Sequence, residues 1–90
     1  MELAWTPQSL EDRRTIYDYI ADKNGMAALA LDELISKKLA QLVDHPELGR
    51  SGRLLGTREL VIHKNYVVIY DLAETEVRIL RVLHSTRQWP

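Results

Sequence analysis

Alternating apolar and polar residues begin the chain. Leu3 and Trp5 lie two positions apart, separated and preceded by small or charged residues, and this period predicts a short strand against a core. Thr6-Pro7 ends the strand and starts a helix. Its cap is either Thr6, with proline in the first helical position, or Ser9 one step later, paired with an aspartate.

Two stretches of helical periodicity follow. The first ends near Lys23, and Asn24-Gly25 after it is a turn signal. The second must end at Asp44 or His45, because Pro46 disfavours helical geometry in the residue before it. The residues predicted to face the core are Leu10, Ile16, Tyr17 and Ile20 in the first helix, and Ala28, Leu31, Ile35, Leu39 and Leu42 in the second.

The second half of the chain has the pattern of a β-meander. Residues 58–63 alternate, Lys64-Asn65 is a hairpin turn, residues 66–70 are apolar on both faces as in a central strand, and residues 77–84 form the last strand. The loop at residues 46–56 has no apolar periodicity, so no strand is predicted there. The predicted order is β-α-α-β-β-β, with the first strand at a sheet edge and a helical hairpin on one face. This is a two-layer α+β fold in a single domain, residues 1–90.

Composition narrows the class of protein. The chain has 90 residues, of which 46% are hydrophobic and 28% charged, which is typical of a folded domain with one modest core. It has no cysteine, and its start lacks the basic and apolar regions of a signal peptide, so we expect a cytoplasmic protein. His45, His63 and His84 are too far apart to predict a metal site, and no cofactor-binding or nucleophile motif is present.

Charge divides the chain into two halves. Residues 1–49 hold five Lys/Arg and nine Asp/Glu, a balance of 5 − 9 = −4, whereas residues 50–90 hold seven and four, a balance of 7 − 4 = +3. A basic second half indicates either an anionic partner or simply a solvated charged face. The charge pattern alone leaves both interpretations open.

Candidate functional groups lie in the strand-rich half. Antiparallel pairing places several cations and histidines along one sheet edge, where they could hold RNA phosphates and supply an acid or base. The alternative is that arginines such as Arg78 and Arg81 are solvated or paired. Trp89, one residue from the end, either packs on the core or anchors a partner. The cluster consists of Arg58, His63, Lys64, Arg78, Arg81, His84 and Arg87.

The order of these elements and several local sequences resemble the ParE/RelE toxin superfamily. The sequences are residues 45–50 (HPELGR), 58–61 (RELV), 65–70 (NYVVIY) and 82–90 (VLHSTRQWP). The resemblance covers nearly the whole chain. It implies the toxin of a bacterial type II toxin-antitoxin module, bound and neutralised by a cognate antitoxin of the ParD or RelB type in a hetero-oligomeric complex, with no membrane and no cofactor.

The superfamily has two activities on one fold, so the fold does not choose between them. RelE-like members are ribosome-dependent mRNA endonucleases, which typically have an arginine where this chain has Val67 and a lysine-rich strand where it has Leu60-Val61-Ile62. ParE-like members poison DNA gyrase, and the ending with His84, Arg87 and Gln88 is closer to theirs. The resemblance therefore favours a gyrase-binding toxin without a catalytic site.

Two sets of target residues follow from the resemblance. For a ParE-like toxin, the expected gyrase contacts are Arg58, Arg81, His84, Arg87 and Trp89. For a RelE-like ribonuclease acting on mRNA at the ribosome, the acid or base is His84 or His63, and the phosphates are held by Arg58, Lys64, Arg81 and Arg87. The antitoxin surface is predicted from surplus apolar residues on the second helix, which either form a groove for an amphipathic helix or widen the core face. These residues are Met26, Leu29 and Ala30.

Overall fold

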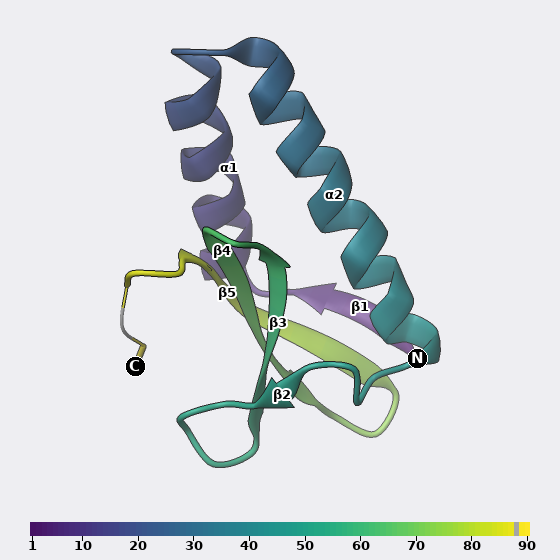
Figure 1. The fold of residues 1–90 in the computed structure, drawn as a ribbon. Coiled ribbons are helices and arrows are strands. Elements are labelled where there is room, and N and C mark those ends of the chain that lie inside the picture. The colour runs from purple at the N-terminus through teal and green to yellow at the C-terminus, as the bar shows by residue number, and fades with distance from the viewer. Residues whose placement is uncertain (88) are drawn as a thin grey trace.

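A computed structural model describes residues 1–87 and 89–90. Two helices pack on one face of a five-stranded sheet whose strand order is β1-β5-β4-β3-β2 (Figure 1). Strand β1 runs parallel to β5, and the other neighbours are antiparallel. The elements are β1 (Glu2–Trp5), α1 (Pro7–Ala21), α2 (Gly25–Asp44), β2 (Arg50–Ser51), β3 (Thr57–His63), β4 (Tyr66–Leu72) and β5 (Glu76–His84).

Side-chain caps begin both helices. The Thr6 hydroxyl accepts a hydrogen bond from the Ser9 backbone N–H at 3.2 Å, with Pro7 in the first helical position, so the first of the two predicted caps forms. The Thr6 hydroxyl also donates to the carbonyl of Ile79 in β5 at 2.8 Å. Asn24 caps α2 through the Ala27 N–H. The caps therefore determine where each helix leaves the sheet.

The core lies between α2 and the inner face of the sheet. Helix α2 contributes Ile35, Leu39 and Leu42, all nearly inaccessible, which confirms its predicted stripe. Central strand β4 contributes Val68 and Tyr70. The sheet side of the core is completed by Leu60, Ile62, Val77, Ile79 and Val82. The predicted α+β architecture is confirmed.

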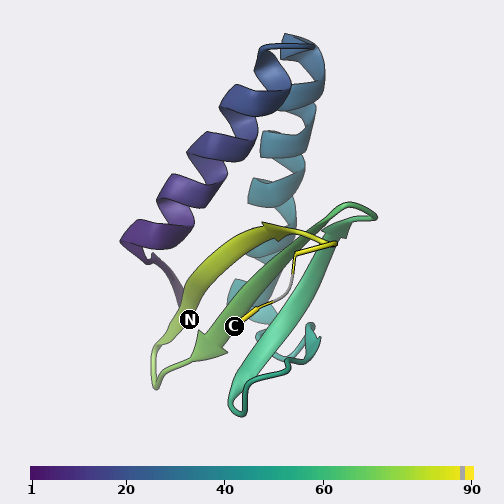
Figure 2. The same cartoon turned by 90° about the vertical axis from the view of Figure 1, so that its left-hand side faces the viewer.

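Two predictions about local structure are wrong. Leu10 and Tyr17 do not face the core: their exposed fractions are 52% and 36%, because α1 meets the sheet through Ser9 and Asp12 instead. The hairpin also projects beyond the small sheet (Figures 1 and 2), so part of each helix has no strand beneath it. The second wrong prediction concerns the loop at residues 46–56, which contains strand β2. A strand of two residues is too short to show an alternating pattern in the sequence.

No helix in the described part of the chain is both long and apolar enough to cross a membrane.

Candidate functional site on the outer face of the sheet

The outer face of the sheet carries no helix, yet its centre is apolar and covered. Val67, Ile69 and Leu83 on this face are exposed by only 9%, 2% and 2%. They are covered in part by Leu80 and by Trp89 from the C-terminal segment, which crosses in front of the sheet on the side away from α2 (Figure 2). Trp89 therefore packs on its own chain, one of the two arrangements considered for it.

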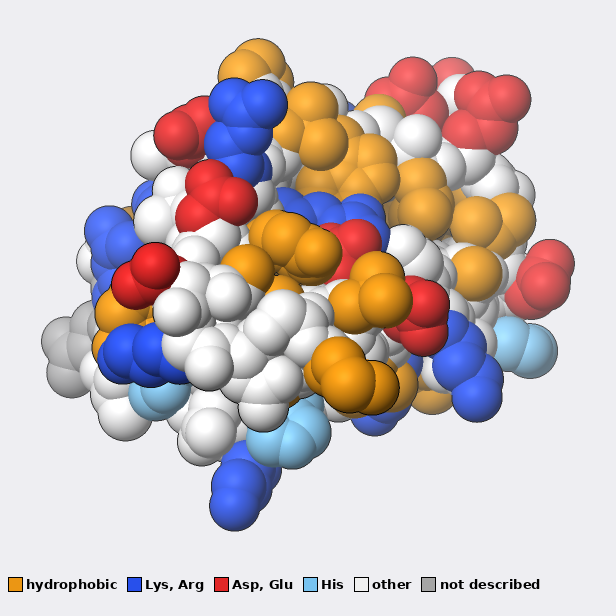
Figure 3. Space-filling view, turned by 90° about the horizontal axis from the view of Figure 1, so that it is seen from above, with side chains coloured by type: hydrophobic (Ala, Val, Ile, Leu, Met, Phe, Trp, Pro, Cys, Tyr) orange, Lys and Arg blue, Asp and Glu red, His pale blue; other side chains and the backbone are white. Residues whose placement is uncertain are grey.

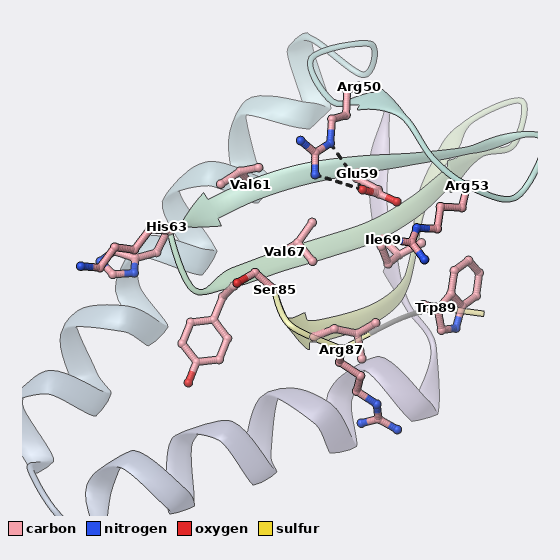
Figure 4. Close-up of a pocket in the computed structure, with 13 residues that line it drawn as sticks. Arg50, Arg53, Glu59, Val61, His63, Val67, Ile69, Ser85, Arg87 and Trp89 are labelled. Atoms are coloured by element: carbon pink, nitrogen blue, oxygen red, sulfur yellow. Dashed lines mark hydrogen bonds and ion pairs between the residues drawn. The ribbon is translucent and has the colours of Figure 1, made fainter.

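A hollow of about 300 Å³ lies on this face, bounded by the C-terminal segment and the loop after β2 (Figure 4). Its floor is apolar and includes Val61, Val67 and Ile69. Its rim is basic: Arg53 lies beside Trp89, and Arg87 reaches away from the floor (Figure 4). The basic side chains in the lining are Arg50, Arg53, His63, Lys64 and Arg87. This combination of apolar floor and cationic rim suits the side chains of a protein partner.

The arginines that line the hollow differ in whether they form an ion pair within the chain. Arg50 donates to Glu59 at 3.2 Å, and this pair forms one wall of the hollow (Figure 4). Within the described residues, Arg53 and Arg87 have no ion pair with an acidic side chain. These two guanidinium groups therefore keep their hydrogen-bonding capacity for a ligand.

Arg58 lies outside the hollow and holds the loop that precedes β2. Its guanidinium donates to the carbonyl of Gly49 at 2.9 Å and to that of Glu47 at 3.3 Å. From beneath, the Tyr70 hydroxyl donates to the carbonyl of Pro46 at 2.8 Å and accepts from the Gly49 N–H at 2.9 Å. Burial raises the pKa of this phenol. The contacts give Arg58 a structural role.

Arg81 and Arg78 are both paired. Asp12 of α1 accepts from Arg81 at 2.7 and 3.0 Å, and from the Val82 N–H at 3.0 Å. Only 13% of each side chain is exposed, and the hydrogen bond to Asp12 raises the pKa of Arg81. Arg78 pairs with Asp71 at 2.6 Å near the surface. The interpretation of these arginines as paired side chains is confirmed.

The two histidines of the predicted cluster do not share one cavity. His63 lines the outer hollow, whereas His84 packs edge-on against Tyr66, with ring centroids 5.3 Å apart. Its Nδ1 accepts from the Thr86 N–H at 3.2 Å and lies 2.8 Å from the Thr86 hydroxyl. Tyr66 pairs with both histidines in the sheet register, so a whole strand separates them.

The structure therefore brings together part of each predicted set. Lys64, His63, Arg87 and Trp89 line the hollow, whereas Arg58, Arg81 and His84 do not, and Gln88 lies outside the described residues. Arg50 and Arg53 also line the hollow but belong to neither predicted set, because their segment has no apolar periodicity that would place it beside the sheet. Their spacing with glycines in residues 49–53 was the available signal. The roles in target binding stay predictions.

A second, apolar groove lies between the helical hairpin and the β3–β4 turn. It has a volume of about 320 Å³ and includes Ala30, one of the three predicted antitoxin residues. Met26, one turn before Ala30, and Leu29, immediately before it, are exposed by 85% and 51%. Hydrophobic side chains spread across this end of the molecule among charged ones (Figure 3). The groove is lined by Ile20, Ala27, Ala30, Leu31, Leu34, His63, Asn65 and Tyr66.

Within the described residues, histidine, aspartate and glutamate side chains form no cluster of three or more that could hold a metal ion.

Comparison with known proteins identifies the family. The family model for the ParE toxin of the type II toxin-antitoxin system parDE matches residues 3–89. The protein Y4kP of Sinorhizobium fredii is 34% identical over 98% of this chain and 92% of its own length. Toxin RelE2 of Caulobacter vibrioides is 33% identical over 96% of this chain and 97% of its own. The chain belongs to the ParE toxin family of type II toxin-antitoxin systems.

Solved structures agree with this assignment. The chromosomal ParDE toxin-antitoxin system from P. aeruginosa includes a chain that superposes with a TM-score of 0.82 at 26% identity, covering 93% of this chain and 95% of the other. The YoeB–YefM complex from Staphylococcus aureus has a chain with a TM-score of 0.64 at 17% identity, covering 92% and 94%. The second likeness shows the fold alone.

Proposed function

We propose that this toxin binds DNA gyrase and stalls it with DNA cleaved, which blocks replication, and that a cognate antitoxin neutralises it. The observation that carries the proposal is the apolar floor of the outer hollow. Val67 lies in that floor, at the position where the RelE-like relatives typically have a phosphate-binding arginine. An apolar floor with arginines only at its rim favours contact with a protein surface over a scissile phosphate.

The placement of the other groups supports the same choice. RNA cleavage requires an acid or base and cations that converge on one phosphate, within hydrogen-bonding reach. Here the carbonyls of residues 47 and 49 hold Arg58, and Asp12 holds Arg81. His84 is separated from His63 by Tyr66. Arg58, Arg81, His84 and His63 thus lie in four different places.

Neutralisation is assigned to the groove beside the helical hairpin. Its lining from the two helices is entirely apolar. Met26 and Leu29, outside that lining, add two exposed apolar side chains on the same helix. An amphipathic helix of a ParD- or RelB-like antitoxin would bury these side chains in a helix-in-groove contact. The solved ParDE toxin-antitoxin system from P. aeruginosa, whose chain is 26% identical to this one, supports a hetero-oligomeric complex here as well.

The test is a supercoiling assay with purified gyrase and purified toxin. We expect inhibition at stoichiometric toxin, together with accumulation of cleaved DNA. The double variant Arg53→Gln/Arg87→Gln removes two rim cations and should weaken inhibition. The control Arg78→Gln removes one cation of the same kind, outside the hollow, and should leave inhibition unchanged. Gyrase that works normally with stoichiometric wild-type toxin would exclude this function.

A ribosome-dependent mRNA endonuclease is the second candidate function. The similarity to Toxin RelE2 and the shared rim position of His63, Lys64 and Arg87 favour it. Primer extension on a reporter mRNA after induction separates the two candidates. Cuts inside translated codons would support the endonuclease, and their absence alongside gyrase inhibition would support the first proposal.

A further inference from the structure

The loop between β2 and β3 presents two leucines at its tip. Leu55 is fully exposed, and Leu54 is exposed by 47%. Both side chains are large and apolar, and their exposure to water is unfavourable relative to a polar residue at the same place. Adjacent exposed leucines at the end of a projecting loop mark an interaction site rather than scattered surface residues.

The loop is held in one conformation by its own hydrogen bonds. Gly52 N–H donates to the Thr57 carbonyl at 2.8 Å, while the Thr57 N–H and hydroxyl donate to the Leu54 carbonyl at 3.0 and 2.6 Å. Gly52 packs so closely that a Cβ there would lie 2.3 Å from the Thr57 hydroxyl oxygen. Gly56 has a φ of +86°, which suits glycine. A loop ordered in advance loses little conformational entropy when it binds.

The position and charge of the loop indicate what it binds. It lies at the opposite end of the molecule from the tip of the helical hairpin (Figure 1), while its Arg53 borders the outer hollow. Residues 50–58 contain three arginines and no acidic residue. A second copy of this chain meeting it tip to tip would bring like charges together, whereas a carboxylate-rimmed surface would be attracted.

We propose that Leu54 and Leu55 form an apolar tip that inserts into a concave apolar pocket of the toxin's protein target, with acidic residues around that pocket facing Arg53. The inference rests on the proposed function for the identity of the target, DNA gyrase. It extends the contact surface from the outer hollow onto the β2–β3 loop. It also separates the target contact from the antitoxin groove.

The test compares wild-type toxin with Leu54→Gln/Leu55→Gln in the gyrase supercoiling assay. The variant should need about 10- to 100-fold more toxin for half-inhibition, the loss expected when one or two buried leucines become polar. Its melting temperature and its affinity for the co-encoded antitoxin should stay close to wild-type values, because Leu55 is fully exposed and neither leucine belongs to the hydrophobic core. Leu10→Gln on α1 is the control, because the exposure of Leu10 (52%) is close to that of Leu54 (47%), and it should inhibit like the wild type.

Growth arrest after induction gives a readout that does not depend on gyrase. If wild-type toxin arrests growth but leaves gyrase active, the proposed target is wrong, and loss of arrest in the tip variant still supports the tip as a target contact. A tip variant with full potency in both assays overturns the inference. A tip variant that loses antitoxin affinity or changes the oligomeric state also overturns the inference. A wild-type toxin that is inactive in both assays overturns it as well.

Discussion

Tyr70 shows how one side chain of the core positions a surface segment. Its ring lies in the fully buried centre of the sheet, and its hydroxyl reaches the backbone of the loop at residues 46–49. A Cβ on Gly49 would lie 2.7 Å from that hydroxyl oxygen, so glycine is what allows the close approach. Contacts with Tyr70 thus fix the positions of Pro46 and Gly49 in the HPELGR segment. Arg50, the last residue of that segment, lines the hollow.

Replacing Tyr70 with phenylalanine should destabilise the fold by about 1–3 kcal/mol, because it leaves the buried Gly49 N–H and the partly buried Pro46 carbonyl without their partner. Urea unfolding followed by circular dichroism measures the change. Tyr19→Phe is the matched control: Tyr19 is 64% exposed, and its loss of one hydroxyl should change stability by less than about 0.5 kcal/mol. Equal stability of the two variants would contradict the role assigned to Tyr70.

The raised pKa of Tyr70 predicts that the stability of the fold decreases at alkaline pH. Burial raises the pKa of Tyr70 in the folded state above its ordinary value of 10.0, so the folded chain holds this proton more tightly than the unfolded chain does. The resulting stabilisation is fully present below that ordinary value and is lost as pH rises through the higher folded pKa. Unfolding measured from pH 8 to pH 11 should show a steeper alkaline loss in wild type than in Tyr70→Phe. Parallel curves would contradict it.

At the scale of elements, a bulge in β5 and one aspartate join the helical layer to the sheet. Opposite Ile69-Tyr70 the register shifts, so that Ile69 pairs with Arg81 and Tyr70 with Ile79, leaving Leu80 as the extra residue. The shift lets both Ile79 and Val82 face the core although they are three positions apart. Beyond the end of β1, Asp12 of α1 takes over as partner of the β5 backbone.

Asp12→Ala should cost about 3 kcal/mol, because it leaves the Arg81 guanidinium, mostly buried, without its counter-charge. The measurement is again chemical denaturation. The double variant Asp12→Leu/Arg81→Met removes both charges together and should recover part of this stability, since an apolar pair of similar volume often replaces a buried ion pair at little cost. The Val82 N–H still lacks its acceptor in this variant, so the recovery should be incomplete. A double variant no more stable than Asp12→Ala would contradict this explanation.

For the molecule as a whole, the two proposed recognition surfaces lie on different layers. The apolar groove belongs to the helical hairpin, whereas the outer hollow and the leucine tip belong to the face of the sheet that carries no helix and to its far edge. Not all of the positive charge in the second half is available to a partner, because Arg50, Arg78 and Arg81 have acidic partners within the chain. What remains for a partner is concentrated at Arg53, Arg87 and their neighbours around the hollow.

Separate surfaces predict separable losses of function. Met26→Gln/Leu29→Gln should weaken binding of the co-encoded antitoxin by about 2 kcal/mol or more, the transfer free energy of large apolar side chains that a docked helix would bury. Titration calorimetry measures it. Leu48→Gln, with the same 51% exposure as Leu29 but on the loop before β2, is the control and should bind normally. Equal antitoxin affinities of the wild type, the double variant and the control would mean that the antitoxin does not contact Met26 and Leu29.

The sequence by itself determined the elements that have a strong period or an unambiguous stop signal. Helix α2, central strand β4 and the turns at Asn24-Gly25 and Lys64-Asn65 follow from local patterns, because burial of one face imposes that period on the residues. The resemblance to the ParE/RelE superfamily rests on the order of these elements together with the local sequences that accompany it, and the comparisons confirm it.

Only the tertiary structure decided which charges are free and which faces are covered. Arg81 and its partner Asp12 are 69 residues apart, and Trp89 reaches the outer face after the last strand has ended. The bulge at Leu80 and the two-residue β2 leave no periodic signal. Such features depend on long-range pairing and on the direction of side chains. A local pattern carries information about which residues are buried, but not about which distant group will meet them.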